Sequence, residues 1–229
     1  MTPNNQPFWW EAAPPSTLPE MPVLTSCDVV IVGAGYTGLS AGLTLARMGR
    51  PVQIFDAMRP GEGASTRNGG IASGNLRPSR QELEKKFGAE RAQAIAIESK
   101  AAREDLAQFI AAENIDCDFQ IVGRFSGASH AGDYEKLARE ADYLANTLGV
   151  EAFAVPRASQ HAHLGTDFYH GGMVRMDIGG LHPAKLHAGM LAKAVEAGAL
   201  IHGETPVKGI RRDGEGWEVE TSRGVVKAG

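Results

Sequence analysis

Three glycines, Gly33, Gly35 and Gly38, form the pattern in this sequence that points most directly to chemistry. They follow the apolar run Val29–Val32 and open a helical pattern, and the next apolar run ends at the acidic residue Asp56. This order of strand, GxGxxG, helix, strand and acid is the fingerprint of dinucleotide binding. The glycines allow a tight turn, close approach of backbone to a pyrophosphate, and close helix–strand packing. The helix N-terminus offers N–H groups to phosphate, and the acid is expected to bind the adenosine ribose.

The fingerprint does not choose between NAD and FAD, because both cofactors contain the ADP half. A glycine-rich turn with no ligand is the alternative, which the matching order of strand, helix and acid disfavours. A second signal is the loop at residues 59–80, which is rich in glycine and proline among arginine, asparagine, serine and threonine. Loops this long commonly serve a ligand, although a merely flexible surface loop is the alternative.

Residues 61–70 of this loop read GEGASTRNGG, and residues 179–183 read GGLHP before a helical pattern. With the fingerprint, these segments resemble the D-amino acid oxidase or glycine oxidase (DAO) superfamily of FAD-dependent enzymes. Within it, the chain looks most like the γ-glutamylputrescine oxidase type of amine oxidoreductase, through CDV at 27–29, GYTGLS at 35–40 and the ASxRNGG pattern. The resemblance covers residue 26 to the end of the chain.

The resemblance implies FAD as the cofactor, with the loop lying along the pyrophosphate and reaching the flavin ring. Hydroxyl and guanidinium groups suit phosphate, and glycines let the backbone pass a flat ring. The backbone of Val207 is an implied adenine contact, although an ordinary β-branched strand residue is the alternative. The predicted cofactor-binding residues are Gly33, Gly35, Tyr36, Thr37, Gly38, Asp56, Ala57, Ala64, Ser65, Thr66, Arg67, Asn68, Gly69, Gly70 and Val207. No catalytic residue and no metal site is assigned.

Two positions depart from the family pattern. Asp56 stands where the family more often has Glu, which shortens the reach to the ribose by one methylene. Thr66 stands where Gly is common, so a strained backbone at that position is in question.

The resemblance implies an amine or amino-acid oxidase or dehydrogenase with a small-molecule substrate. A hydride passes from the carbon beside the substrate nitrogen to flavin N5, the imine is hydrolysed, and oxygen or another acceptor reoxidises the flavin. Family members are longer, so the substrate-binding and final FAD-binding segments are expected beyond residue 229, and the isolated chain is not expected to be active. A noncatalytic FAD- or nucleotide-binding fragment that needs this missing half or a partner is the alternative. An NAD-dependent dehydrogenase is a weaker one, because nicotinamide enzymes have no need of the ASxRNGG loop.

The fold predicted to position these residues is α/β. It is a Rossmann-like FAD-binding βαβ domain with an inserted α+β substrate or cap domain, and its C-terminal part is missing. The expected segments are an irregular arm at 1–25, FAD-binding segments at 26–81 and 176–229, and the cap domain at 82–175. Strands are predicted at 29–32, 51–55, 119–122, 123–128, 171–176, 200–202, 207–211 and 217–221, and helices at 37–48, 80–87, 89–113, 134–148 and 183–197. The continuously apolar strand at 29–32 is expected to be fully buried, and a turn at 213–216 is expected to join the last two strands. Gly49 is expected to end the first helix and His182 to cap the last one.

Composition narrows the possible partners. The 229 residues carry a net charge of -4 with pI near 6.0, which gives no basic footprint for nucleic acid. No apolar stretch reaches the length of about 18 residues that a membrane span needs, and a secretory signal is not evident, so we expect a cytoplasmic protein. The sequence does not reveal the oligomeric state.

Several other side chains receive ordinary structural interpretations. Cys27, before the first strand, and Cys117, in a predicted strand, are expected to be buried thiols. The aromatic residues Phe8, Trp9 and Trp10 are expected to dock on the body of the protein. The histidines show no metal-binding spacing and are expected to be satisfied or solvated.

Overall fold

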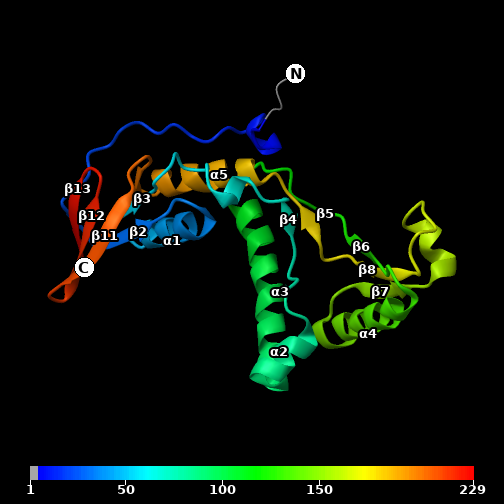
Figure 1. The fold of residues 1–229 in the computed structure, drawn as a ribbon. Coiled ribbons are helices and arrows are strands. Elements are labelled where there is room, and N and C mark those ends of the chain that lie inside the picture. Colours follow the sequence, from blue (N-terminus) through cyan, green and yellow to red (C-terminus); the bar gives the residue numbers. More distant parts are fainter. Residues whose placement is uncertain (1–4) are drawn as a thin grey trace. The chain divides into compact units, whose positions relative to one another are not determined.

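The computed structural model describes residues 5–229, which divide into two compact units (Figure 1). The first unit takes in the described residues up to Gly70 together with Glu113–Cys117 and His182–Gly229. The second consists of Ile71–Ala112 and Asp118–Leu181. All the predicted cofactor-binding residues belong to the first unit.

The first unit is built on a parallel sheet with the order β10-β3-β2. Its strands are β2 (Val29–Val32), β3 (Val52–Phe55) and β10 (Leu200–His202). The central strand β3 is buried along its whole length, as expected for a parallel strand covered on both faces. The prediction that residues 29–32 form a fully buried strand is wrong, because β2 lies at the edge of this sheet and Val32 is 57% exposed.

Helices α1 (Tyr36–Arg47) and α5 (Pro183–Glu196) pack on each other, and α1 also packs on β2 and β3. Gly49, at a φ of +75°, ends the first helical segment as predicted. Pro183 occupies the first turn of α5, and the His182 Nδ1 accepts a hydrogen bond from the Lys185 N–H at 3.2 Å. The expectation that His182 caps this helix is therefore confirmed.

A second sheet completes the first unit, with the order β1-β13-β12-β11. Its strands are β1 (Ser26–Cys27), β11 (Val207–Asp213), β12 (Gly216–Thr221) and β13 (Gly224–Ala228). A tight turn at Gly214, with a φ of +62°, joins β11 to β12 as expected. In Figure 1 the parallel strands lie between this sheet and helices α1 and α5. The pairing of β1 with β13 was not predicted, because neither short segment has a strand pattern of its own.

The second unit is a mixture of helices and antiparallel strands. Its helices are α2 (Arg80–Phe87), α3 (Ala89–Ala112) and α4 (Ala131–Leu148), with a 3-10 helix η3 (Arg157–Ala162). One sheet has the order β4-β9-β5 and the other β6-β8-β7. The strands are β4 (Ile71–Ala72), β5 (Gln120–Ile121), β6 (Arg124–Gly127), β7 (Ala152–Val155), β8 (Gly172–Arg175) and β9 (Gly179–Gly180). Among the described residues, no helix is both long and apolar enough to cross a membrane.

Local sequence signals set the helix ends in this unit. Ser79 and Glu82 form a reciprocal capping box that begins α2. Gly88, at a φ of +83°, separates α2 from α3, and Gly149 ends α4 in the left-handed conformation.

The prediction that Cys117 lies in a strand is wrong: it lies in a bend, where its carbonyl accepts a hydrogen bond from the His182 N–H at 2.7 Å. No disulfide joins it to Cys27.

A buried ion pair lies at the end of β8. Arg175 donates to Asp177 through its Nε at 3.0 Å and through a terminal nitrogen at 2.9 Å, and its other terminal nitrogen donates to Asn75 Oδ1 at 3.2 Å. The two charged side chains are only 6% and 9% exposed. Such a pair is costly to break, since removal of one partner leaves the other charge buried and uncompensated.

We expect the substitution Asp177→Asn to lower the free energy of unfolding by about 3–5 kcal/mol, because it leaves the Arg175 guanidinium without its counter-charge. Urea unfolding followed by circular dichroism measures the change. Asp133→Asn is the matched control: it removes the exposed pair with Lys136 and is expected to change stability little. Equal unfolding midpoints for the two variants would contradict the conclusion that the buried Arg175–Asp177 pair stabilises the fold.

Candidate functional site

The candidate site lies at the carboxyl ends of the parallel strands. Val32, Phe55 and His202 stand in register at the ends of β2, β3 and β10. Hydrogen bonds continue past the strands, from Gly33 N to the Phe55 carbonyl at 2.7 Å and from Asp56 N to the His202 carbonyl at 2.9 Å. The loops after the three strands therefore begin at one edge of the sheet, where ligands of open α/β sheets bind.

The glycine-rich turn after β2 is fixed by a very close backbone contact. Gly33 has a φ of +97°, and a Cβ placed on Gly38 would lie 1.9 Å from the Gly33 carbonyl oxygen. Only glycine fits at position 38, so the first turn of α1 rests directly on the end of β2. This turn contains no acidic residue. The partial positive charge of this helix end and the N–H groups of Thr37 and Gly38, which have no acceptor one turn back in the helix, are therefore available to an anion, as a pyrophosphate site requires.

Asp56 is held against this turn by both carboxylate oxygens. Oδ2 accepts a hydrogen bond from the Ala34 N–H at 2.7 Å, and Oδ1 accepts one from the Met58 N–H at 2.9 Å. Each carboxylate oxygen can accept a further hydrogen bond, so the group fits the ribose hydroxyls of a dinucleotide. The shorter Asp side chain is thus anchored by backbone on either side of it.

The loop after β3 returns to the same helix end. It contains a 3-10 turn, η2 (Ala64–Thr66), in which the Ser65 Oγ accepts a hydrogen bond from the Tyr36 N–H at 3.1 Å. The Asn68 side chain closes this turn, because its Nδ2 donates to the Ser65 carbonyl at 2.9 Å and its Oδ1 accepts from the Gly70 N–H at 2.9 Å. A hydroxyl of the predicted loop is thereby placed at the first turn of α1.

Thr66 and Arg67 make their contacts within the chain. Thr66 is 2% exposed, and its Oγ1 donates to the Gly61 carbonyl at 2.5 Å. Arg67 is exposed and donates through Nε to the Glu62 carbonyl at 2.7 Å. The left-handed φ values of the loop are at Gly61 (+95°) and Gly70 (+70°), and Thr66 is not among the described residues with positive φ. Its β-branched side chain therefore causes no strain there.

The remaining predicted residues lie around these contacts. Val207 begins β11, and two residues before it the Thr205 N–H donates to the Asp56 carbonyl at 2.7 Å. The exposed members of the predicted set are Thr37, Ala57, Ala64, Arg67, Asn68 and Gly69. Hydrogen bonds join the glycine turn, Asp56 and Ser65, whereas direct contact of Val207 with a cofactor stays a prediction.

Two contacts from α5 were not predicted from the sequence. His187 is 2% exposed, and its Nε2 lies 2.7 Å from the Ala34 carbonyl oxygen. Burial lowers the pKa of His187, so the ring is neutral and Nε2–H donates to this carbonyl. The Tyr36 hydroxyl donates to the Pro183 carbonyl at 2.7 Å, and burial raises the pKa of Tyr36 to about 12. These side chains attach α5 to the glycine turn; a single histidine on an apolar helix carries no spacing signal that could reveal this.

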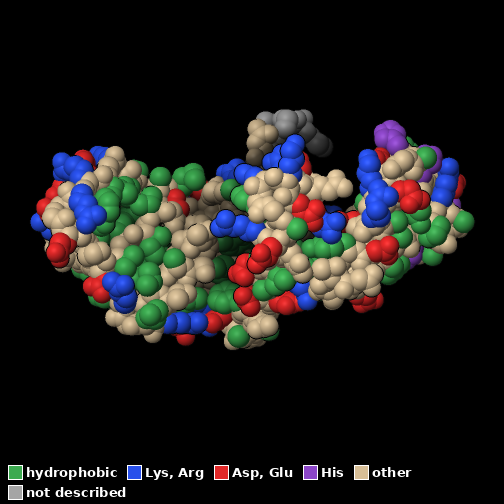
Figure 2. Space-filling model, turned by 90° about the horizontal axis from the view of Figure 1, so that it is seen from below, with side chains coloured by type: hydrophobic (Ala, Val, Ile, Leu, Met, Phe, Trp, Pro, Cys, Tyr) green, Lys and Arg blue, Asp and Glu red, His purple; other side chains and the backbone are tan. Residues whose placement is uncertain are grey.

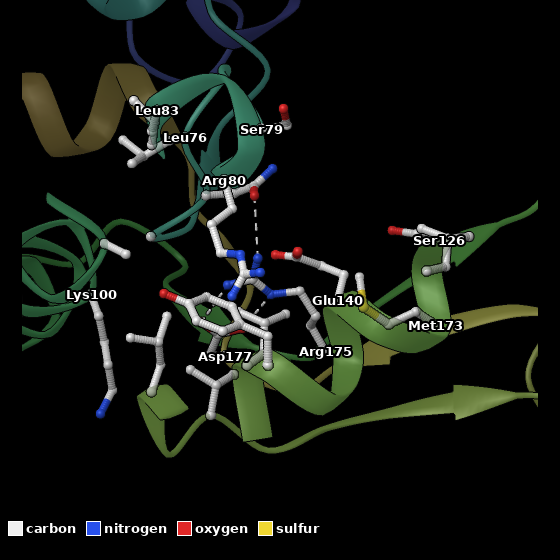
Figure 3. Close-up of a pocket in the computed structure, with 18 of the residues that line it drawn as sticks. Leu76, Ser79, Arg80, Leu83, Lys100, Ser126, Glu140, Met173, Arg175 and Asp177 are labelled. Atoms are coloured by element: carbon white, nitrogen blue, oxygen red, sulfur yellow. Dashed lines mark hydrogen bonds and ion pairs between the residues drawn. The ribbon is translucent and has the colours of Figure 1, made fainter. Parts of the chain in front are cut away.

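A separate cavity of about 360 Å³ lies within the second unit, lined by residues of α2, α3, α4 and β8 (Figure 3). Its charged side chains include the Arg175–Asp177 pair, and the Arg80 guanidinium stacks 4.4 Å from the centre of the Tyr143 ring. None of the predicted cofactor residues lines it. The cavity is therefore distinct from the candidate dinucleotide site.

Histidine side chains gather at one end of the second unit, around η3 (Figure 2). His161 lies 2.8 Å from Asp167 Oδ1, and His163 stacks on Phe125 with 6.2 Å between ring centres. Among residues 5–229, no group of three or more histidine, cysteine or acidic side chains is arranged to hold a metal ion. These histidines make ordinary polar and ring contacts.

Comparison with known proteins assigns this chain to a family of FAD-dependent enzymes. Residues 28–228 match the DAO family, described as FAD dependent oxidoreductase. A probable oxidoreductase OrdL of Rhizobium meliloti (strain 1021) is 32% identical over 223 residues, 96% of this chain and 52% of that protein. The γ-glutamylputrescine oxidoreductase of Escherichia coli (strain K12) is 38% identical over 100 residues, 44% of this chain and 24% of that protein. The chain thus spans about half the length, or less, of these curated relatives.

The fold has a similar counterpart among solved structures. The crystal structure of glycine oxidase from Geobacillus kaustophilus superposes with a TM-score of 0.75 at 24% identity. The match covers 90% of this chain and 54% of that one. The predicted α/β fold is therefore confirmed, and the match extends over about half of that chain.

The buried His187 makes stability depend on pH. Because its pKa in the folded chain is below the ordinary 6.5, the unfolded chain binds a proton that the folded chain does not as the pH falls below 6.5. Stability is therefore fully present above this pH and decreases below it. We expect the melting temperature to fall between pH 7 and pH 5, and to fall less in His187→Gln, whose amide can still donate to Ala34. The exposed His130→Gln is the control that should keep the wild-type slope, and a wild-type slope in His187→Gln would contradict the role of burial.

Proposed function

Since the chain belongs to the DAO family of FAD-dependent oxidoreductases, we propose that its first unit holds the ADP portion of FAD in a protein that oxidises the C–N bond of a small amine or amino acid. The proposed substrate class is supported by the names of two similar proteins. One is a glycine oxidase and the other a γ-glutamylputrescine oxidoreductase, so an amino acid and a putrescine derivative are named for those proteins.

One observation carries the cofactor part of the proposal: the glycine turn, Asp56 and the η2 turn meet through hydrogen bonds at one end of α1. The N–H groups of the first helical turn would bind the pyrophosphate, and Asp56 would accept hydrogen bonds from the ribose. Residues 65–70 would continue towards the flavin ring, and Val207 would lie at the adenine.

The division of work between protein and cofactor follows from these positions. Bound FAD supplies the two-electron oxidation, and the resulting imine is hydrolysed by water. This chain would contribute placement of the cofactor, because the N–H groups and side chains named above would bind and orient it. Oxygen or another electron acceptor completes the reaction in this proposal.

The test uses the absorbance of the purified 229-residue chain in the visible flavin bands, with the released cofactor identified by mass. We expect bound FAD in the wild-type chain and a loss of affinity of at least about 100-fold in Gly38→Ala, because the added Cβ collides with the Gly33 carbonyl and displaces the cradle.

Gly132→Ala is the matched control, since a Cβ at that exposed helical position meets no atom within 4 Å and should leave FAD binding unchanged. A folded chain that binds NAD but takes up no added FAD would overturn the FAD assignment. Equal FAD affinity in Gly38→Ala and the wild type would place the cofactor elsewhere. The amine substrate is then tested on the longer protein by reduction of its flavin under anaerobic conditions.

A further inference from the structure

Part of the arm before the first strand contacts the loop that follows Asp56. Its 3-10 turn, η1 (Phe8–Trp10), projects three aromatic rings, of which only Phe8 is largely exposed, at 70%. Trp9 and Trp10 are partly buried, which confirms the expected docking for these two residues, whereas the expectation is wrong for Phe8. Their polar atoms select where the arm docks, since an indole has one N–H donor that must be satisfied when buried.

Trp10 binds the buried hydroxyl of the loop. Its Nε1 donates to the Thr66 Oγ1 at 2.8 Å, and this hydroxyl donates in turn to the Gly61 carbonyl at 2.5 Å. The two bonds form a chain from the arm to the start of the loop. The indole face of Trp10 also carries the Arg67 guanidinium, whose central carbon lies 4.5 Å from the ring centre. A cation–π contact of this kind adds to the hydrogen bond in fixing the loop.

Trp9 binds the other end of the same turn. Its Nε1 donates to the Asn68 carbonyl at 2.8 Å, and its ring meets His182 edge-on with 4.9 Å between ring centres. Asn68 is the residue whose side chain closes η2, so both indoles act on the turn that presents Ser65 to α1. Loss of these contacts would leave η2 held by fewer bonds before a ligand binds, and ordering the turn during binding reduces affinity.

We propose that Trp9 and Trp10 are positioning residues for the cofactor: their indole N–H groups hold residues 61–70 in the conformation that FAD binds. The proposal rests on the proposed function for its ligand, while the ordering of the loop by the arm is a property of the chain without ligand. The two parts can therefore be measured separately.

The first measurement is FAD affinity of the 229-residue chain, by titration of flavin fluorescence. Trp10→Phe keeps an apolar ring and removes the N–H, and we expect it to weaken FAD binding about 2- to 10-fold, as for the loss of one hydrogen bond. Thr66→Val removes the acceptor of this bond and also the bond to the Gly61 carbonyl, so it should weaken FAD binding at least as much. In the double variant the two losses should be less than additive, because each removes the same bond.

Trp217→Phe is the matched control. Trp217 on β12 is the chain's remaining tryptophan, and it also has an arginine, Arg212, 5.3 Å from its ring centre. The same substitution and the same type of cation–π contact are thus tested away from the loop. We expect it to leave FAD affinity unchanged.

The second measurement needs no cofactor. Trypsin cuts after Arg67, and mass spectrometry gives the rate at that bond relative to the bond after Arg223. We expect cleavage after Arg67 to accelerate at least about fivefold in Trp10→Phe and in Trp9→Phe, and to stay at the wild-type rate in Trp217→Phe, because an ordered loop resists proteolysis.

The outcomes separate the two claims. Faster cleavage at Arg67 with weaker FAD binding supports the proposal. If the wild-type chain binds no FAD, the proposed function fails, and faster cleavage still supports ordering of the loop by the arm. Unchanged cleavage and unchanged affinity in Trp10→Phe, with circular dichroism showing a folded chain, overturn the proposal. If Trp10→Phe does not fold, the same comparison is made with Thr66→Val.

Discussion

Contact between the first turn of α1 and the end of β2 is the constraint on which the site depends. Because a Cβ at Gly38 would lie 1.9 Å from the Gly33 carbonyl oxygen, the helix can approach the sheet only with glycine at this position. That approach brings the backbone of the turn within hydrogen-bond distance of Asp56, the residue that follows the neighbouring strand β3. It also brings Tyr36 N–H to Ser65 in the following loop. One steric requirement thus aligns three segments that are separate in the sequence.

Buried polar contacts then keep these segments in place. Helix α5 contributes the His187 ring and the Pro183 carbonyl, each bonded to a residue of the glycine turn or of the first turn of α1. Inside a protein a donor or acceptor that loses its partner costs more than a satisfied hydrogen bond gains. These hydrogen bonds therefore fix the position of α5 on α1, in addition to the apolar area that the two helices bury. Apolar contact alone would hold the two helices together with less precision at the cradle.

Sequence reasoning succeeded where a local pattern determines the structure. The βαβ unit, the start of α2 at Arg80 and the strand β10 followed from apolar runs, caps and glycines, and the family assignment is confirmed. It failed where neighbours determine the structure. The run at residues 29–32 has the composition of a buried strand, yet β2 has β3 as its partner in the described sheet and stays partly exposed. Strands β7 and β13 form because they pair with β8 and β12, and their short sequences alone do not predict this pairing.

The same distinction applies to the site residues. Residue chemistry suggested that the hydroxyl of Thr66 and the guanidinium of Arg67 suit phosphate; both make contacts within the chain, to the Gly61 and Glu62 carbonyls, and their contact with a cofactor stays a prediction. Ser65 differs, because its oxygen accepts from the Tyr36 N–H and its own O–H remains able to donate. The polar side chains of this loop therefore have two different roles. Some fix its backbone, and this fixed backbone, with the donor of Ser65 and the N–H groups of α1, forms the surface that an anionic ligand meets.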